Sequence, residues 1–322
     1  MAAIKRCLQC KVNPAVMDMP RHRTRLCGDC YIDFVRAQVR TAIREYRMLR
    51  YDQRILVAVS GGKDSLALWD ILLDMGYNVD GLYLGLGIGG YSSRSEQIVR
   101  DFAERRGVVL HVERMEEAYG FDIPATVQAA KKDRHTRSAC GTCGLAKRYA
   151  FNQVALVGEY DIMATGHNLD DEASQLFGNV MRWQTDFLAR QSPSLPASPG
   201  ELAAKVKPLY RLTEKEMAAY CVIKGLNYVV EECPLVTGNT QMMYKEMLNA
   251  MEHEAPGAKA AFLFGYLDRV REPFFGDAAA QSAASTVPCQ VCGMPTVLSG
   301  DRTEATCAFC RTRSKMLTVL NG

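Results

Sequence analysis

Long hydrophobic runs are missing from this sequence of 322 residues. The first residues contain no apolar run of signal-peptide type, and no apolar stretch is long enough to span a bilayer. We therefore expect a soluble, cytoplasmic protein with no membrane partner. A strong net charge is missing too, because 39 basic and 36 acidic residues nearly cancel to +3. Total charge is thus weak evidence for nucleic-acid binding, and the placement of the charges matters more.

Cysteine, in contrast, is abundant. Ten of the twelve cysteines lie in C-x-x-C pairs, and only Cys221 and Cys233 stand alone. Because no secretory signal accompanies them, this spacing indicates metal ligation or redox chemistry in a reducing compartment rather than a disulfide framework.

Two groups of four cysteines stand at the two ends of the chain. They are Cys7, Cys10, Cys27 and Cys30 at the start, and Cys289, Cys292, Cys307 and Cys310 at the end. Four thiolates suit tetrahedral Zn²⁺, which can fold a segment that has almost no core of its own. His22 could replace one thiolate of the first group. The alternative is that these cysteines are redox-active or solvent-exposed thiols. We expect one structural Zn²⁺ in each group.

A basic amphipathic helix follows the first group. Its apolar stripe is Ile32, Val35, Val39, Ile43, Tyr46 and Leu49, and its other side carries Arg36, Arg40, Arg44, Arg47 and Arg50. Such arginines form either a solvated face or a contact surface for a phosphate backbone, and the helix alone favours the solvated face.

The middle of the chain alternates short apolar runs with amphipathic helical patterns. The expected strands are RILVAVS (54–60), VDGLYLGL (79–86), VVLHVER (108–114) and YDIMATG (160–166), with helices opening near Asp64, Ser95, Leu145 and Asp170. Continuous apolar runs are typical of strands buried on both faces, so we predict a doubly wound α/β fold with a parallel sheet. Thr213 and Glu216 are spaced as a capping box of a further helix.

Two breaks divide this pattern. A loop with prolines and serines is expected between about 184 and 204, and an Ala/Ser-rich linker over 277–286. The predicted organisation is an N-terminal zinc finger (1–31), a basic helix (32–53), a catalytic domain (54–272), a linker (273–287) and a zinc ribbon (288–322).

A glycine-rich turn, SGGKDS (60–65), lies between the first expected strand and its helix. Glycines let backbone N–H groups converge on an anion, and the helix N-terminus adds favourable partial charge. The Walker pattern is excluded because Asp64 follows Lys63, where a serine or threonine is required. The motif resembles the PP-loop of ATP pyrophosphatases, which split ATP between the α- and β-phosphates and adenylate an oxygen of the substrate. The alternative is a turn that merely starts a helix.

Three cysteines of the middle region form a separate set, Cys140 and Cys143 as a pair and Cys233 as a distant single residue. Three thiolates fix three irons of a cubane cluster and leave one iron open; alternatively, a pair cycles through a disulfide while it carries sulfur. Cys233 could also be a buried apolar residue, as we assume for Cys221.

Charged residues follow this pair and a later strand. Lys147 lies one helical turn after Cys143, where it could neutralise phosphates or an oxyanion. Asp170 and Asp171 open a helix after the TGHN turn. They either stabilise the helix dipole or, facing the phosphate loop, hold Mg²⁺ or transfer a proton.

The order of these motifs resembles the PP-loop tRNA 2-thiouridine synthetases. The match comprises the two N-terminal C-x-x-C pairs, the basic helix, SGGKDS, CGTCGLAKRY, TGHNLDDEAS, ECP and the two C-terminal pairs. The KRYAFN continuation is closer to the iron–sulfur-dependent 5-methyluridine enzymes than to the cytoplasmic wobble-uridine relatives.

This resemblance implies roles for individual residues. Cys140, Cys143 and Cys233 match the ligands of a 4Fe-4S cluster whose open iron carries sulfur, and Lys147 and Asp171 match the catalytic pair. The ATP site is matched by Ala58, Ser60, Gly61, Gly62, Lys63, Asp64, Ser65, Leu84, Leu86, Lys147, Gly166 and Asp171. Sulfur comes from a ubiquitin-like carrier with a C-terminal thiocarboxylate or from sulfide.

We therefore expect an ATP- and Mg²⁺-dependent tRNA sulfurtransferase that adenylates O2 of a uridine, 5-methyluridine of the T-loop, and replaces it with sulfur. The alternatives are wobble-uridine thiolation, a PP-loop adenylating ligase without sulfur, and a non-catalytic metal-binding tRNA adaptor. The oligomeric state stays open, with a homodimer among the options.

Overall fold

The computed structural model describes residues 5–133, 135–197, 202–236, 240–281, 286–297 and 304–321. Its centre is a six-stranded sheet with the strand order β5-β4-β3-β6-β8-β7. The strands are β3 (Ile55–Val59), β4 (Val79–Gly85), β5 (Leu110–Arg114), β6 (Ile162–Thr165), β7 (Ser194–Leu195) and β8 (Ala204–Val206). None of the helices in these ranges has the length and apolar character needed to cross a membrane.

The sheet is parallel except at one edge. Strand β3 pairs in parallel with β4 on one side and β6 on the other, and only β7 runs antiparallel to its neighbour β8. Residues Ile55, Leu56 and Val57 are fully buried, as expected for a strand with helices on both of its faces. The predicted α/β fold with a mostly parallel sheet is confirmed.

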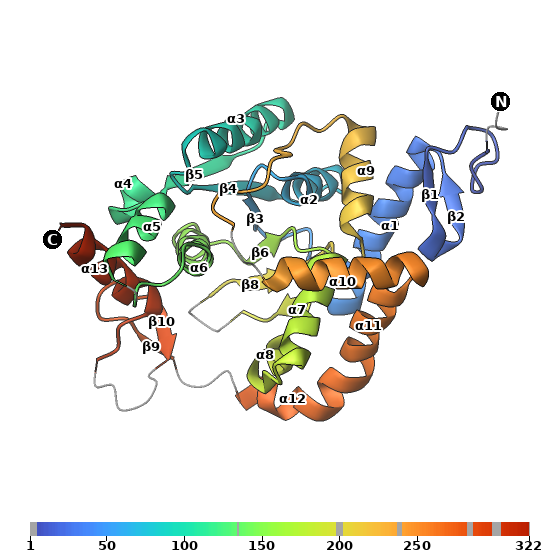
Figure 1. The fold of residues 1–322 in the computed structure, drawn as a ribbon. Coiled ribbons are helices and arrows are strands. Elements are labelled where there is room, and N and C mark those ends of the chain that lie inside the picture. The colour runs from blue at the N-terminus through green and yellow to red at the C-terminus, as the bar shows by residue number, and fades with distance from the viewer. Residues whose placement is uncertain are drawn as a thin grey trace.

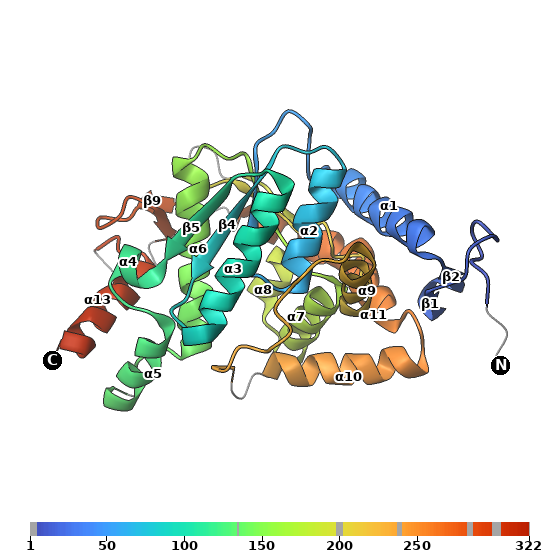
Figure 2. The ribbon, with the colours of Figure 1, turned by 90° about the horizontal axis from the view of Figure 1, so that it is seen from above.

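Helices cover both faces of this sheet. Helices α2 (Lys63–Asp74) and α3 (Gly89–Arg106) lie on one face, and α6 (Ala139–Val157) lies on the other (Figures 1 and 2). The short α4 (Met115–Tyr119) and α5 (Ile123–Lys132) follow β5. Since β3 and β6 both end beside the start of α2, the carboxyl edge of the sheet forms the floor of a ligand site.

A second helical layer lies beside the β6–β8 half of the sheet. It contains α7 (Leu169–Met181), α8 (Thr185–Arg190), α9 (Glu214–Lys224), α10 (Thr240–Glu254), α11 (Ala258–Tyr266), the π-helical turn η2 (Leu267–Arg271) and α12 (Glu272–Gln281). Helix α9 begins with the predicted capping box, in which Thr213 Oγ1 accepts from the N–H of Glu216 and the Glu216 carboxylate accepts from that of Thr213.

The N-terminal cysteine group belongs to a small module at one end of the molecule (Figure 1). It comprises β1 (Met17–Met19), the 3₁₀ turn η1 (Pro20–His22), β2 (Thr24–Leu26) and α1 (Gly28–Tyr46). Arg21 and His22 both contact the carboxylate of Glu216, at 2.9 and 3.2 Å. His22 is therefore engaged with α9 and is not a fifth candidate ligand.

The C-terminal group lies at the opposite end (Figure 1). Strands β9 (Thr286–Pro288) and β10 (Pro295–Val297) form an antiparallel pair, and α13 (Ala308–Asn321) packs against α5 and α6. Phe309 stacks on Tyr149 of α6 with their ring centroids 4.0 Å apart. This contact joins the ribbon to the helix that carries two of the middle cysteines.

Helix boundaries differ from the sequence prediction in several places. Helix α3 begins at Gly89 rather than near Ser95, and α6 begins at Ala139 rather than near Leu145. Glycines disfavour a helix locally, but Ser138 caps the N–H of Gly141 and Ser92 Oγ accepts from the N–H of Ile88. The expected loop at 184–204 contains helix α8 and strand β7.

The linker expected over 273–287 is helical as far as Gln281, in α12. Alanine has the highest intrinsic helix propensity, and the AAA run at 278–280 extends the helix that precedes it. Residues 282–285 lie outside the described ranges.

The basic face of α1 is partly neutralised. Arg36 contacts Asp74 at 2.6 Å and Arg50, beyond the helix end, contacts Asp52 at 3.0 Å. Arg40, Arg44 and Arg47 are exposed and, among the described residues, form no ion pair.

Candidate active site

The two terminal cysteine groups are built as metal sites. Within each group of four, all Sγ atoms lie within 4.8 Å of one another. Burial opposes the thiolates of Cys7 and Cys289, but hydrogen bonds from backbone N–H groups outweigh it and lower the pKa of each to about 6. Backbone hydrogen bonds lower the pKa of Cys10 as well. Four convergent sulfurs, with thiolates favoured in each group, fit a tetrahedral metal ion.

The glycine-rich turn lies between β3 and α2. The Ser65 hydroxyl accepts from the N–H of Ser60 at 3.1 Å and donates to the carbonyl of Gly62 at 2.9 Å, which holds the turn closed on itself. Gly61 has φ of +79°, and an added Cβ would stand 3.0 Å from the carbonyl oxygen of Ser95. The turn thus needs glycine both for its conformation and for its distance from α3.

A cavity of about 620 Å³ opens above this turn and contains most of the predicted ATP-site residues. Ala58, Ser60, Gly62, Asp64, Ser65, Leu84, Leu86, Lys147 and Gly166 all line it. Its volume is in the ordinary range for a small-molecule site. The pocket therefore joins the glycine-rich turn to Leu84, Leu86 and Gly166, which the family resemblance places in the ATP site.

Gly61 and Lys63 do not line this cavity in the described part of the chain. The ammonium of Lys63 contacts Glu214 at 2.6 Å and Asp64 at 3.3 Å. Burial opposes its charge, but these two carboxylates outweigh it and raise its pKa. The lysine is thus held at the side of the turn by two acids.

Asp64 is the acidic group of the turn that faces the cavity. Burial disfavours its carboxylate more strongly than Lys63 stabilises it, and the pKa of Asp64 rises to about 6. Its Oδ1 accepts from the amide of Asn168 at 3.1 Å. The turn is therefore tied to the start of α7 by the side chain of Asp64.

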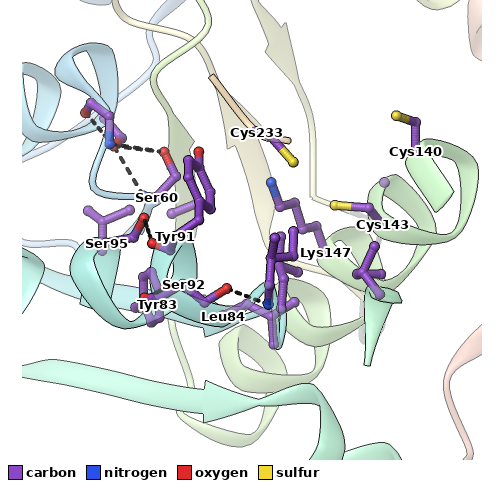
Figure 3. A pocket seen from close by; sticks show the side chains of 18 of the residues that line it. Ser60, Tyr83, Leu84, Tyr91, Ser92, Ser95, Cys140, Cys143, Lys147 and Cys233 are labelled. Atoms are coloured by element: carbon purple, nitrogen blue, oxygen red, sulfur yellow. Dashed lines mark hydrogen bonds between the residues drawn. The ribbon is translucent and has the colours of Figure 1, made fainter. Parts of the chain in front are cut away.

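The three middle cysteines lie at the other end of the same cavity. Figure 3 shows the amine of Lys147 beside the sulfurs of Cys233 and Cys143, across the pocket from Ser60, with Cys140 farther out at the same end. Burial raises the pKa of Cys143, and the positive charge of Lys147 acts in the opposite direction. The structure thus brings together two segments about ninety residues apart in the chain.

These three sulfurs are farther apart than those of the terminal groups. In the described part of the chain, the groups of cysteines whose sulfurs all lie within 4.8 Å of one another are the two terminal groups of four. A cubane cluster is larger than one ion, and its cysteine ligands stand farther apart. Three free thiols on the wall of one cavity are a donor set that fits three irons of such a cluster.

Cys221 lies outside this set. It is fully buried in α9, and burial raises the pKa of its thiol to about 12. The prediction that it is an apolar core residue is confirmed.

The two adjacent aspartates of α7 have different environments. Asp170 is buried against the Lys259 ammonium, and its Oδ2 accepts from the N–H of Glu214 at 2.8 Å. Asp171 completes a capping box with Asn168 and contacts Lys245 at 2.6 Å. Burial opposes its carboxylate, but Lys245 outweighs this and lowers the pKa of Asp171.

Asp171 lines a second cavity, of about 510 Å³, rather than the first. The two cavities share His167 and Gln241 as lining residues. The predicted catalytic pair therefore does not meet in one pocket: Lys147 lies in the first cavity and Asp171 in the second, with His167 at their junction.

Glu214 and Lys245 were missed by the sequence analysis. They form an alternating chain of charges that runs from Asp64 through Lys63, Glu214 and Lys245 to Asp171. No local motif marks them, because their partners lie 31 to 151 residues away in sequence. Only the packing of α9 and α10 beside the turn reveals them.

Gly166 provides a direct test of the cavity floor. An added Cβ would lie 2.9 Å from the backbone of Asp64 and Ser65, which cannot rotate away. We expect Gly166→Ala to displace the turn and weaken ATP binding about tenfold or more, measured by titration calorimetry. Gly90→Ala is the control, because its Cβ would meet nothing within 4 Å. Equal ATP affinity in both variants would contradict this role of Gly166.

Comparison with known proteins identifies the family. A model described as "PP-loop domain" matches residues 35–244, and one described as "2-thiouridine synthetase TtuA, N-terminal LIM domain" matches residues 6–32. The chain is 46% identical to a tRNA-5-methyluridine(54) 2-sulfurtransferase of Thermus thermophilus, over 94% of this chain and 90% of that protein. A protein of the same name from Pyrococcus horikoshii is 40% identical, over 89% and 86% of the two chains.

A solved structure agrees in fold. The U34-tRNA thiolase NcsA from Methanococcus maripaludis, solved with its [4Fe-4S] cluster, superposes with a TM-score of 0.76 at 22% identity, over 99% of this chain and 97% of that one. Because the superposition covers 99% of this chain, the two proteins share their fold over the terminal modules as well as the central domain. On the family models and the relatives at 40% identity and above, the chain belongs to the PP-loop tRNA 2-thiouridine synthetase family.

Proposed function

We propose that this chain is an ATP-dependent tRNA sulfurtransferase that replaces O2 of a tRNA uridine, 5-methyluridine 54, with sulfur. One observation carries the proposal: three free thiols and Lys147 share a single cavity with a glycine-rich phosphate turn. A phosphate turn alone supports adenylation of any acceptor. Thiols in the same cavity supply sulfur chemistry at the place where the adenylated oxygen must leave.

ATP would bind with its phosphates on the backbone N–H groups of the Ser60–Ser65 turn and the start of α2. The partial positive charge of this helix terminus favours the anion. The carboxylate of Asp64 offers oxygen ligands of the kind that Mg²⁺ prefers. Lys63 would exchange its contact with Glu214 for the departing pyrophosphate.

Cys140, Cys143 and Cys233 would hold a 4Fe-4S cluster, which supplies one open iron that carries sulfur. Zn²⁺ would fill the two terminal groups of four cysteines. The sulfur atom itself would come from a ubiquitin-like thiocarboxylated carrier protein or from sulfide.

The chemistry then has two steps. O2 of the uridine attacks the α-phosphorus, the bond from this phosphorus to the bridging oxygen breaks, and pyrophosphate departs. Sulfide next attacks C2 of the base, and the C2–O2 bond breaks so that O2 leaves as part of AMP. Lys147 would stabilise the negative charge that develops at phosphorus and on AMP, and Asp171 would accept a proton.

The terminal modules and α1 would hold the tRNA. Arg40, Arg44 and Arg47 are exposed and free of acidic partners in the described part of the chain, so they are available to phosphates. The enzyme would act in the cytoplasm, as a monomer or a homodimer.

Anaerobic reconstitution tests this function. Enzyme supplied with iron, sulfide, Mg²⁺-ATP and an unmodified tRNA should produce 2-thiouridine, detected by nucleoside mass spectrometry together with AMP and pyrophosphate. The position of the thionucleoside distinguishes residue 54 from the wobble position. Absence of any thionucleoside from a cluster-loaded enzyme would refute the proposal.

The pKa of Asp64 predicts a pH dependence of nucleotide binding. Below pH about 6 this carboxyl gains a proton and loses the charge that attracts the cation, so Mg²⁺-ATP affinity should fall as pH decreases through 6. Above pH 7 the affinity should be level. Asp64→Asn should bind Mg²⁺-ATP more weakly and should not show the fall in affinity that protonation of Asp64 causes. ATP itself titrates equally in both experiments, so the difference between the two pH profiles reports on Asp64 alone. Identical pH profiles would contradict the assignment.

A further inference from the structure

The second cavity has walls of a kind that suits a nucleobase. It is lined by His167, Asp171, Glu172, Gln175, Asn179, Phe187, Arg190, Gln191, Lys207, Gln241, Met242 and Lys245. Phe187 of α8 exposes 52% of its surface, and the guanidinium of Arg190 lies 5.4 Å from the centre of its ring. Aromatic rings and guanidinium planes are the surfaces on which proteins stack unpaired RNA bases.

The polar wall behind Phe187 is fixed in place. The Gln191 amide donates to the carbonyl of Glu172 at 2.8 Å and accepts from Asn179 at 3.0 Å. Lys207 contacts Glu172 at 2.8 Å, so the buried acid has a partner. Arg190, in contrast, is exposed and has no acidic partner among the described residues, which leaves its charge available to a phosphate.

The position of the cavity is the second observation. It meets the first cavity at His167, which lines both. The imidazole is held in place by a hydrogen bond of 2.8 Å between its Nδ1 atom and the Thr165 hydroxyl. The first cavity must hold ATP and is lined by the three thiols, whereas Asp171 lines the second cavity and not the first. A base that enters the second cavity can therefore direct one edge past His167 toward the phosphate turn and the thiols.

We propose that the second cavity receives the target uridine, flipped out of its tRNA loop, with the base on Phe187 and O2 directed through the junction at His167. The inference rests on the proposed function. An enzyme that changes an atom of a base must take that base out of its stack, which costs free energy. Stacking on an aromatic ring and contact with nearby cations offset part of this free energy. A volume of about 510 Å³ accommodates a nucleoside.

Photo-cross-linking tests where the base binds. A tRNA transcript with 5-iodouridine at position 54 is irradiated on the cluster-loaded enzyme with a non-hydrolysable ATP analogue, and the cross-linked peptide is identified by mass spectrometry. Attachment at Phe187 is the expected result. Attachment confined to residues of the first cavity, such as Tyr91, or to neither cavity, overturns the inference. The latter result would leave the second cavity to another partner, such as the tail of a carrier protein.

Kinetics provide an independent readout. Phe187→Ala should raise KM for tRNA about tenfold and leave the Kd for ATP unchanged, because loss of one stacking surface weakens only the RNA. Phe274→Ala is the matched control, since Phe274 is 75% exposed on α12 and lines neither cavity. An unchanged KM in Phe187→Ala also overturns the inference.

The two proposals fail in different ways. An enzyme that cross-links at Phe187 but forms no thiouridine refutes the sulfurtransferase function and keeps the base site. An enzyme that thiolates tRNA while Phe187→Ala matches the parent protein keeps the function and loses the base site.

Discussion

Replacement of Cys233 by alanine should reduce tRNA thiolation at least about 10³-fold while leaving the fold and the terminal metal ions in place. Cys233 lines the cavity with Cys140 and Cys143 and belongs to neither group of four cysteines. Without its sulfur, two thiols remain to hold a centre that needs three, and catalysis by groups that act as a unit collapses when one is removed. Nucleoside mass spectrometry gives the activity, and visible absorbance gives the cluster content.

Cys221→Ala is the matched control for this experiment. Its thiol is fully buried, and its raised pKa of about 12 keeps it protonated and unreactive. We expect normal thiolation per folded molecule and a small loss of stability from the missing sulfur. Full activity in Cys233→Ala would show that the three-thiol mechanism is wrong, and loss of activity in both variants would point to misfolding.

Replacement of Lys147 by alanine should lower kcat about 10²- to 10³-fold with little change in the affinity for ATP. The amine of Lys147 lies near the sulfurs of Cys143 and Cys233, at the end of the cavity opposite Ser60 (Figure 3). A cation at this position stabilises charge that develops only as pyrophosphate and AMP depart, so its loss affects the transition state more than the ground state. Single-turnover measurements of pyrophosphate release and thiouridine formation would show which step slows.

Arg148→Ala controls for the loss of a positive charge from the same helix. Arg148 is adjacent in sequence, exposed, and absent from the lining of both cavities. We expect it to retain near-normal kcat. If Lys147→Ala changed only the ATP affinity, the lysine would be a nucleotide-binding group rather than a catalytic one.

Features encoded over a few neighbouring residues were predictable from the sequence. The strand at 54–60, the SGGKDS turn and the Thr213/Glu216 capping box depend on short-range patterns, and each occurs where the pattern indicates. The helices that begin at Gly89 and Ala139 were predicted to begin six residues later. Glycines give these segments a low helix propensity, and the sequence alone does not show the hydrogen bonds that cap the two helices.

Features that depend on distant segments were not predictable in detail. Nothing near Asp170 and Asp171 shows that one faces Lys259 in the interior and the other faces a cavity. The acid that holds Lys63 comes from α9, 151 residues later, and the partner of Asp171 comes from α10.

By itself, the sequence determined the chemical inventory of this protein: a phosphate turn, two groups of four metal-binding cysteines and three further thiols. These follow from residue type and spacing, which need no knowledge of the packing. Only the tertiary structure decided that Lys147 shares a cavity with the phosphate turn while Asp171 opens to the next one. The physical reason is that the packing of helices on both faces of a parallel sheet, and not the order of motifs along the chain, determines which side chains meet at its carboxyl edge.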